Sequence, residues 1–231
     1  MIQKNYENAA QAIADMQDGA TLLVGGFGGS GLPSHLIAAL VEQGAKDLTV
    51  VSNNIGAVSD GVAALISNNQ VRKIICSFPV GPHAKDLIER LEKGTIELEI
   101  APQGTLAERI RAGGAGVPAF YTPTGTYTEL GEGKETRTFD GRLHLLEQAI
   151  KGDYAFVKAE RADRWGNLVY RKTQRNFNPV MATAARTTIA EVSEIVEVGE
   201  IDPEAIVTPS VFVHRLVKVD LQPEGKVLVN E

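Results

Sequence analysis

The residues best suited to chemistry are the glycines between residues 25 and 31. Five of these seven residues are glycine, and the run reads Gly25, Gly26, Phe27, Gly28, Gly29, Ser30 and Gly31. A chain without side chains lets a ligand approach its main-chain N–H groups closely. Such groups can bind a carboxylate or a thioester oxygen, and a helix that begins directly behind them favours negative charge there. The run therefore predicts an anion-binding loop.

The segments on either side would hold this loop in place. Residues 20–24 form a short apolar run that is typical of a buried strand, and Pro33 sets the φ angle that a first helical turn requires. Apolar residues then recur at helical spacing until Gly44. The order strand, glycine loop, helix is therefore expected around residues 20–43.

The glycine spacing also permits a dinucleotide-binding interpretation. Gly26, Gly28 and Gly31 satisfy the pattern G-x-G-x-x-G between a strand and a helix. That interpretation requires an acidic residue at the end of the second strand, which binds the ribose hydroxyl. The second apolar run ends in Ser52, and Asp47 precedes it, at the wrong end. The pattern therefore argues against NAD, and a dinucleotide-binding oxidoreductase module stays an alternative.

Three amide side chains follow predicted strands on their carboxyl side. Asn53 and Asn54 come after the apolar run at 48–52, and Gln103 comes after residues 96–101. Ligands of open α/β sheets bind at that side of the sheet. Asparagine is also common in turns, and chemistry alone favours that role for the pair. Gln103 could donate a hydrogen bond to an oxyanion without bringing a charge to the site.

Charged residues after Gln103 are expected to be structural. Thr105 and Glu108 have the spacing of a capping box, in which the glutamate binds the first amide of its own helix. Arg109 and Arg111 are interpreted as surface or interface charges. The four histidines show no ligand spacing among themselves, so no metal site is expected.

Bulk properties exclude several classes of protein. The chain has 231 residues, 43% apolar residues and a formal net charge of −6. An acidic chain without a basic face does not suit a nucleic-acid or anionic-membrane partner. The start of the chain has no signal-peptide core, and no apolar run reaches bilayer length, so a cytoplasmic protein is expected. The single cysteine, Cys76, excludes an internal disulfide and is interpreted as a buried core residue.

Strands and helices alternate through the first half of the chain. Strands are predicted at 20–24, 48–52, 74–77 and 96–100, and helices at 8–16, 60–67 and 84–93. This alternation predicts an α/β fold with a mainly parallel sheet covered by helices.

The second half reads as β-hairpins and longer strands. Irregular structure is expected at 113–133, a hairpin around Asp140-Gly141, and a second around Gly166-Asn167. A helix is predicted at 178–185 with Asn178 as its cap, followed by a strand at 187–196. Residues 211–219 read as an edge strand or arm, and 221–231 as a loose tail. No repeat or linker is present, so residues 1–231 are expected to form a single domain.

The glycine loop belongs to a wider pattern that resembles a known family. The Asp18-Gly19 pair, the aliphatic residues 22–24, Gly25-Gly26-Phe27, Gly31 and Pro33 resemble the signature of the A (α) subunit of family I coenzyme A transferases. The resemblance continues at 52–54, 102–111 and 175–178, and it covers nearly the whole chain.

The resemblance implies a function, a fold and a partner. The reaction would move coenzyme A (CoA) from an acyl-CoA, such as succinyl-CoA, to a 3-oxoacid, either 3-oxoadipate or acetoacetate. The glycine loop, Asn53, Asn54 and Gln103 would line the active centre, on the parallel sheet of the CoA-transferase type with added hairpins. CoA would be a substrate, and no permanent cofactor is implied.

The catalytic nucleophile of the family is a glutamate in a Ser-Glu-Asn-Gly motif on a B subunit. This chain contains no such motif, so the resemblance implies half of an αβ or α2β2 enzyme. A non-catalytic homologue that binds a sugar phosphate is a further alternative.

Overall fold

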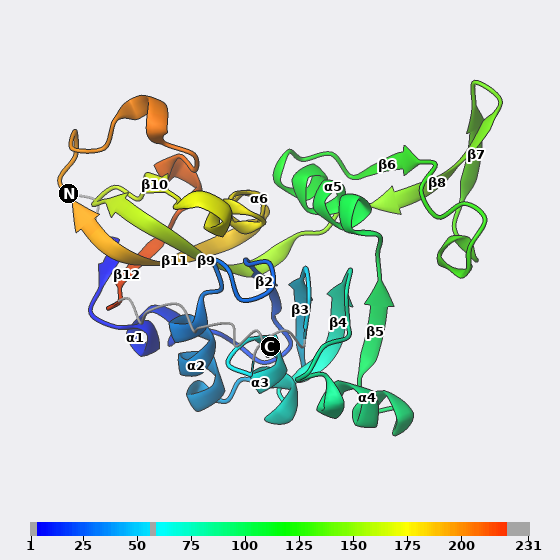
Figure 1. Ribbon diagram of the computed structural model, residues 1–231, viewed down its shortest axis with the longest axis horizontal. Coiled ribbons are helices and arrows are strands. Elements are labelled where there is room, and N and C mark those ends of the chain that lie inside the picture. The colour runs from blue at the N-terminus through cyan, green and yellow to red at the C-terminus, as the bar shows by residue number, and fades with distance from the viewer. Residues whose placement is uncertain (1–3, 56–58, 221–231) are drawn as a thin grey trace, which may run out of the picture.

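A nine-stranded sheet forms the body of the molecule (Figure 1). The computed structural model describes residues 4–55 and 59–220, so the tail expected at 221–231 lies outside the described residues. Within them the strand order is β1-β12-β11-β9-β2-β3-β4-β5, and β10 pairs with β9. The strands are β1 (Asn5–Tyr6), β2 (Thr21–Val24), β3 (Leu48–Ser52), β4 (Val71–Cys76), β5 (Glu97–Ile100), β9 (Gly152–Asp163), β10 (Leu168–Val169), β11 (Ala185–Val196) and β12 (Arg215–Lys218).

Neighbouring strands in this order are parallel, which confirms the predicted α/β class. Side chains of one strand enter two different cores. Leu22 and Val24 pack into one apolar cluster, and Leu23 packs into the other, on the opposite face. All three are fully buried. A parallel sheet covered on both faces requires such continuous apolar runs, because no strand face is left to water.

Helices cover the two faces unequally. One face packs against α1 (Ala9–Ile13), α2 (Ser34–Gln43), α3 (Val62–Ser67) and α4 (Lys85–Glu92). The other face packs against α5 (Gln103–Gly114) and α6 (Asn178–Thr183). Figure 1 shows α5 above the carboxyl ends of β3, β4 and β5. No helix of the described residues is long and apolar enough to cross a membrane.

The sequence predicted an edge strand or arm at residues 211–219. The strand found there, β12, does not lie at the edge of the sheet. Residues of β12 pair with β11 on one side and with β1 on the other. The two residues of β1 thus occupy the edge. Local sequence could not show this, because β1 and β12 are far apart in the chain.

Three strands form a second, antiparallel sheet that projects from the body (Figure 1). They are β6 (Ala119–Thr122), β7 (Thr136–Phe139) and β8 (Arg142–Gln148). Asp140 and Gly141 both have positive φ at the β7–β8 turn, so this predicted hairpin is confirmed. The β9–β10 hairpin is confirmed as well. Strand β6 was missed, because its four residues have no clear period and are stabilised by pairing with β8.

Single turns of 3₁₀ helix complete the described elements. They are η1 (Glu129–Gly131), η2 (Lys172–Arg175), η3 (Pro203–Ala205) and η4 (Ser210–Phe212). Cys76 lies at the end of β4 and is fully buried, as predicted. Burial raises the pKa of its thiol to about 12, so the group stays protonated and unreactive at neutral pH.

The capping box predicted at Thr105 and Glu108 is wrong. Helix α5 begins at Gln103, two residues before Thr105, and no side chain caps it. Glu108 instead forms two hydrogen bonds with Arg111, of 2.7 and 2.8 Å. These bonds lower the pKa of Glu108.

Arg109 was predicted to be a surface or an interface charge, and the surface role is wrong. Its side chain is 11% exposed and contacts Glu99 at 2.6 Å and Glu147 at 3.8 Å. Each of these carboxylates also pairs with a lysine: Lys73 lies 2.8 Å from Glu99, and Lys134 lies 2.6 Å from Glu147. Although burial opposes it, the hydrogen bonds from Lys73 and Arg109 lower the pKa of Glu99. This chain of charges joins the main sheet, α5 and β8.

Replacing Arg109 should therefore destabilise the fold. In Arg109→Met, Glu147 would remain buried with Lys134 as its one remaining cation, and we expect a loss of about 3 kcal/mol in the free energy of unfolding. Urea denaturation followed by circular dichroism measures it. Arg111→Met on the exposed side of the same helix is the control and should change little. Equal losses in both variants would contradict a buried charge chain.

Candidate functional site

The glycine loop between β2 and α2 folds as a tight hairpin tip. Phe27 and Ser30 exchange two main-chain hydrogen bonds, each of 3.0 Å, around Gly28 and Gly29. Gly28 has φ of +61°. A positive φ at the first central position of a two-residue turn favours glycine. The turn itself therefore requires part of the glycine run.

Other glycines of the loop are required by the close approach of Asn178. A Cβ atom at Gly25 would lie 1.9 Å from the Asn178 Oδ1, and one at Gly31 would lie 2.8 Å from its Nδ2. The Asn178 side chain accepts from the Lys158 amide at 2.9 Å and donates to the Gly31 carbonyl at 3.0 Å. The predicted cap role is therefore wrong. Phe177 precedes α6, and Asn178 instead holds the glycine loop.

Asn176 holds the other side of the loop. Its Oδ1 accepts from the Gly26 amide at 3.2 Å, and its Nδ2 donates to the Ser30 carbonyl at 3.0 Å. The two asparagines of the 175–178 motif thus clamp the loop from α6 and the turn before it.

Most amides of the loop already have acceptors inside the protein. The Gly25 amide donates to the Phe156 carbonyl at 2.9 Å, and the Gly28 amide donates to Asn54 Oδ1 at 2.8 Å. In the described part of the chain, the amide of Gly29 at the exposed tip has no such acceptor. It is the donor of this tip that a ligand oxygen can reach.

The start of α2 already carries a negative group. Glu191 Oε2 accepts from the amides of His35 and Leu36, at 3.0 and 3.1 Å. The anion expected at this helix start is therefore the protein's own carboxylate. Asp47, the acidic residue of the dinucleotide alternative, is exposed and lies before β3, at the opposite end of that strand.

The predicted amide side chains meet in one hydrogen-bond chain. Gln103 Nε2 donates to Asn53 Oδ1 at 2.8 Å. Asn53 Nδ2 donates to Asn54 Oδ1 at 3.2 Å, which also accepts the Gly28 amide. These groups follow the carboxyl ends of β5, β3 and β2, where open α/β sheets bind ligands.

The chain of amides has a buried and an exposed end. Asn53 is 2% exposed, whereas Gln103 is exposed. The hydroxyl of Ser77, which follows β4, lies 2.9 Å from both Asn53 O and Asn53 Oδ1 and can donate its one hydrogen to either oxygen. Ser77 was not predicted, although its place after a strand matches that of Asn53. Asn53, held by Ser77, therefore orients the exposed Gln103 side chain.

An open pocket of about 370 Å³ lies beside Gln103. Its walls are mostly apolar and come from the loop, α5 and α6. They are Phe27, Gly104, Ala107, Asn176, Phe177 and Val180. None of these lining residues carries a carboxylate or a cation. The pocket can therefore bind an oxygen through neutral donors, and its own lining supplies no nucleophile.

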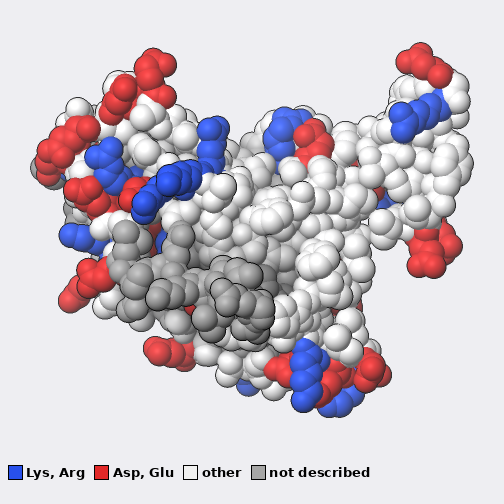
Figure 2. Space-filling model, viewed as in Figure 1, with Lys and Arg blue, Asp and Glu red and all other residues white. Residues whose placement is uncertain are grey.

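On the face drawn in Figure 2, few charged residues lie in the middle of the part that is not grey. Figure 2 shows Lys, Arg, Asp and Glu gathered near its margins, including α4 and the projecting sheet. Within residues 4–55 and 59–220, no group of three or more His, Cys, Asp or Glu side chains is placed to hold a metal ion.

The sequence matches the family model described as Coenzyme A transferase over residues 6–219. It is 53% identical to the A subunit of the 3-oxoadipate CoA-transferase of Pseudomonas putida, over 95% of each chain. It is 51% identical to the A subunit of a probable succinyl-CoA:3-ketoacid coenzyme A transferase of Bacillus subtilis, over 93% of this chain and 89% of that one.

Solved structures share the fold at lower identity. Glutaconate coenzyme A-transferase from Acidaminococcus fermentans superposes with a TM-score of 0.81 at 21% identity, over 94% of this chain and 76% of that one. A thioester complex of an acyl-CoA transferase from Escherichia coli O157:H7 gives 0.84 at 21% identity, over 96% of this chain. This chain spans about half, 51%, of the length of that protein.

The contact between Gly25 and Asn178 can be tested by a double-mutant cycle. Gly25→Ala should cost about 2 kcal/mol of unfolding free energy, because its methyl group displaces the asparagine. Asn178→Ala should cost about 3 kcal/mol through buried groups left without partners. The double variant should be less destabilised than the sum of both by about 1 kcal/mol or more. Urea denaturation measures all three.

Gly104→Ala is the control for the added methyl group. Nothing lies within 4 Å of a Cβ atom built there, and the position is helical, so stability should not fall. Strict additivity of Gly25→Ala and Asn178→Ala would contradict the proposed close approach.

Proposed function

Because this chain belongs to the coenzyme A transferase family, as an A subunit of the type that serves 3-oxoacids, we propose that it completes its site with a B subunit. The single observation that carries this proposal is the Gln103–Asn53–Asn54–Gly28 chain beside a pocket whose lining holds no nucleophile. The chain also lacks the Ser-Glu-Asn-Gly motif. A partner must therefore bring the attacking carboxylate.

The proposed reaction proceeds through covalent steps on that partner glutamate. Its carboxylate attacks the carbonyl carbon of succinyl-CoA and expels the CoA thiolate, which leaves a mixed anhydride. The thiolate then attacks the glutamyl carbonyl, so that succinate leaves and a glutamyl-CoA thioester forms. The acceptor acid repeats both steps in reverse, and the glutamate is regenerated. No proton is gained or lost overall.

This chain stabilises the oxygen that becomes negative in each step. Gln103 Nε2 carries two hydrogens, of which one donates to Asn53, so the other can donate to the oxygen. The exposed Gly29 amide is a second donor of this kind. Preorganised neutral donors stabilise an oxyanion strongly and do not repel the incoming carboxylates.

The apolar residues that line the pocket would exclude water from the reaction. Mixed anhydrides and thioesters react with water, so the site must exclude it. Phe27, Phe177 and Val180 line the pocket beside Gln103, and a B subunit placed over them would close it. We propose an α2β2 assembly of this chain with its B subunit. We also propose succinyl-CoA as donor and 3-oxoadipate as acceptor, since the relatives of Pseudomonas and Bacillus are named for 3-oxoadipate and succinyl-CoA:3-ketoacid transfer. Acetoacetate is the competing acceptor.

The geometry of the site does not favour the two alternatives, a dinucleotide-binding module and a homologue that binds a sugar phosphate. A dinucleotide would place its pyrophosphate at the start of α2, where Glu191 already binds the amides. A sugar phosphate would gain from a cation, and the residues that line the pocket beside Gln103 include none.

The half-enzyme proposal predicts the behaviour of separated chains. This chain alone should not convert succinyl-CoA and 3-oxoadipate, and mixing it with a B subunit that carries Ser-Glu-Asn-Gly should give 3-oxoadipyl-CoA. Chromatographic separation of the CoA esters measures both. Mass spectrometry should find CoA attached to the B chain alone. Turnover by this chain by itself would contradict the proposal, and a B subunit with that glutamate changed to alanine is the control.

Gln103 provides a second test in the mixed enzyme. Gln103→Ala should lower kcat by about 10²-fold, because one donor to the oxyanion is lost, and should change KM for succinyl-CoA much less. Glu108→Gln on the same helix is the matched control, since Glu108 pairs with Arg111 and takes no part in the hydrogen-bond chain. Wild-type kcat in Gln103→Ala would remove Gln103 from the site.

A further inference from the structure

A buried carboxylate lies beneath the start of α2. Glu191, on β11, is 0% exposed, and its Oε2 accepts the amides of His35 and Leu36. The residue before α2 is Pro33, which supplies no side-chain cap. Glu191 therefore takes the role of an N-cap, from a position 156 residues away in the chain.

Lys158 and His35 balance the charge of this carboxylate. Lys158 lies opposite Glu191 in the register of β9 and β11, and its Nζ is 3.7 Å from Glu191 Oε1. His35 Nδ1 is 3.5 Å from the same oxygen. The hydrogen bond with Glu191 raises the pKa of His35, against the effects of burial and of Lys158, and Asp220 adds to the rise.

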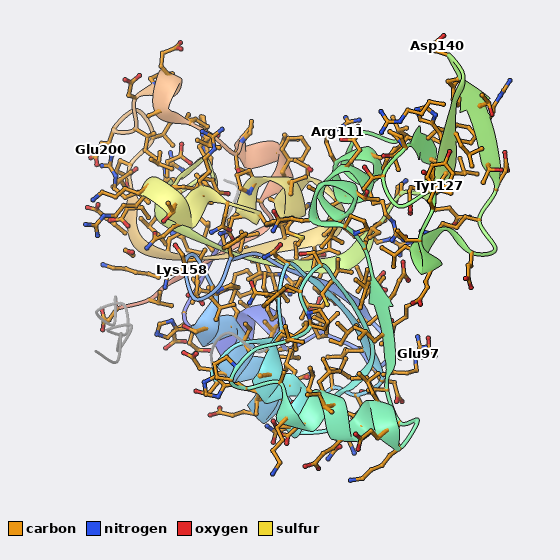
Figure 3. All side chains as sticks on the ribbon, turned by 45° about the vertical axis from the view of Figure 1, so that its right-hand side comes forward. Glu97, Arg111, Tyr127, Asp140, Lys158 and Glu200 are labelled. Atoms are coloured by element: carbon orange, nitrogen blue, oxygen red, sulfur yellow. The ribbon has the colours of Figure 1, made fainter. Side chains whose placement is uncertain are left out.

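The same strands hold the glycine loop. The Lys158 main-chain amide donates to Asn178 Oδ1, and Asn178 in turn holds Gly31. Figure 3 shows Lys158 beside the loop between β2 and α2. The loop is thus bound to β9 through Asn178, and the helix that follows it is bound to β11 through Glu191.

A buried carboxylate caps a helix at a high cost in desolvation. That cost is offset only by charge-assisted hydrogen bonds, the helix dipole and nearby cations. A serine or aspartate at position 33 would satisfy the same amides from the residue directly before the helix. It would not join the helix start to the sheet, whereas Glu191 does. The arrangement therefore fixes the position of the helix start, which a local cap would not do.

We propose that Glu191 is a positioning residue of the transferase site. By holding the first amides of α2 it fixes the far end of the glycine loop, so that the Gly28 amide meets Asn54 and Phe27 stays beside Gln103 at the pocket. Glu191 touches no substrate in this scheme. The inference rests on the proposed function for its effect on catalysis, but its effect on the loop can be measured without a partner or substrate.

Hydrogen exchange on the full chain alone tests the anchoring. In Glu191→Ala the amides of His35, Leu36 and the hydrogen-bonded loop residues Gly26, Gly28 and Ser30 should exchange about tenfold faster or more, because their opening costs less. Glu191→Gln keeps a neutral acceptor, which binds amides less strongly than a carboxylate, and should give an intermediate increase. Glu194→Ala, an exposed carboxylate on the same strand, is the control and should leave these amides unchanged.

Kinetics of the mixed enzyme test the link to catalysis. Glu191→Ala should lower kcat by about 10²-fold through a misplaced loop, with little change in KM, and Glu191→Gln should restore most of it. If Glu191→Ala does not fold, the smaller changes in Glu191→Gln decide the question. Unchanged loop exchange, or a wild-type kcat in a variant whose loop has loosened, would overturn the inference. Inactivity of the wild-type mixture would instead refute the proposed function and leave the anchoring result standing.

Discussion

A loop made mostly of glycine has few side chains with which to stabilise its own conformation, and the structure around residues 25–31 depends on this constraint. Every bond that holds its shape must come from its own main chain or from neighbouring elements. The hairpin tip supplies two bonds between Phe27 and Ser30. Asn54, which follows β3, and Asn176 and Asn178, in the turn before α6 and in α6 itself, supply further bonds. The loop is therefore held mainly by amide side chains of neighbouring elements, and its tip at Gly29 stays exposed.

This arrangement accounts for the electrostatic character of the site. Amide side chains bind the loop and Gln103, and the residues that line the pocket carry no charge. Glu191, which binds the start of α2, is buried, and its Oε1 lies 3.7 Å from Lys158 Nζ. Neutral donors of this kind are what the proposed reaction requires, because they can stabilise a developing oxyanion.

Helix α5 connects this site to the projecting sheet. It begins at Gln103, and Arg109 lies less than two turns later on the same helix. Arg109 joins Glu99 of β5 to Glu147 of β8, and Asp140 and Tyr127 lie on the far part of that projection (Figure 3). The buried charge chain thus fixes α5 between two sheets, and with it the residue that contacts the pocket.

The sequence by itself determined the α/β class, the strands β2, β3, β4 and β5 and both hairpins, because apolar period and turn residues act locally. It also singled out Gly28, Asn53, Asn54 and Gln103, through their place after strands and through the family resemblance. Tertiary structure alone decided how these residues connect. Arg109, Asn178 and Glu191 each find partners far away in the chain, and the positions of β12 and β6 depend on strands that are remote or weakly patterned. Burial and pairing across such distances leave no period in the local sequence, which is why those roles became visible only in the folded chain.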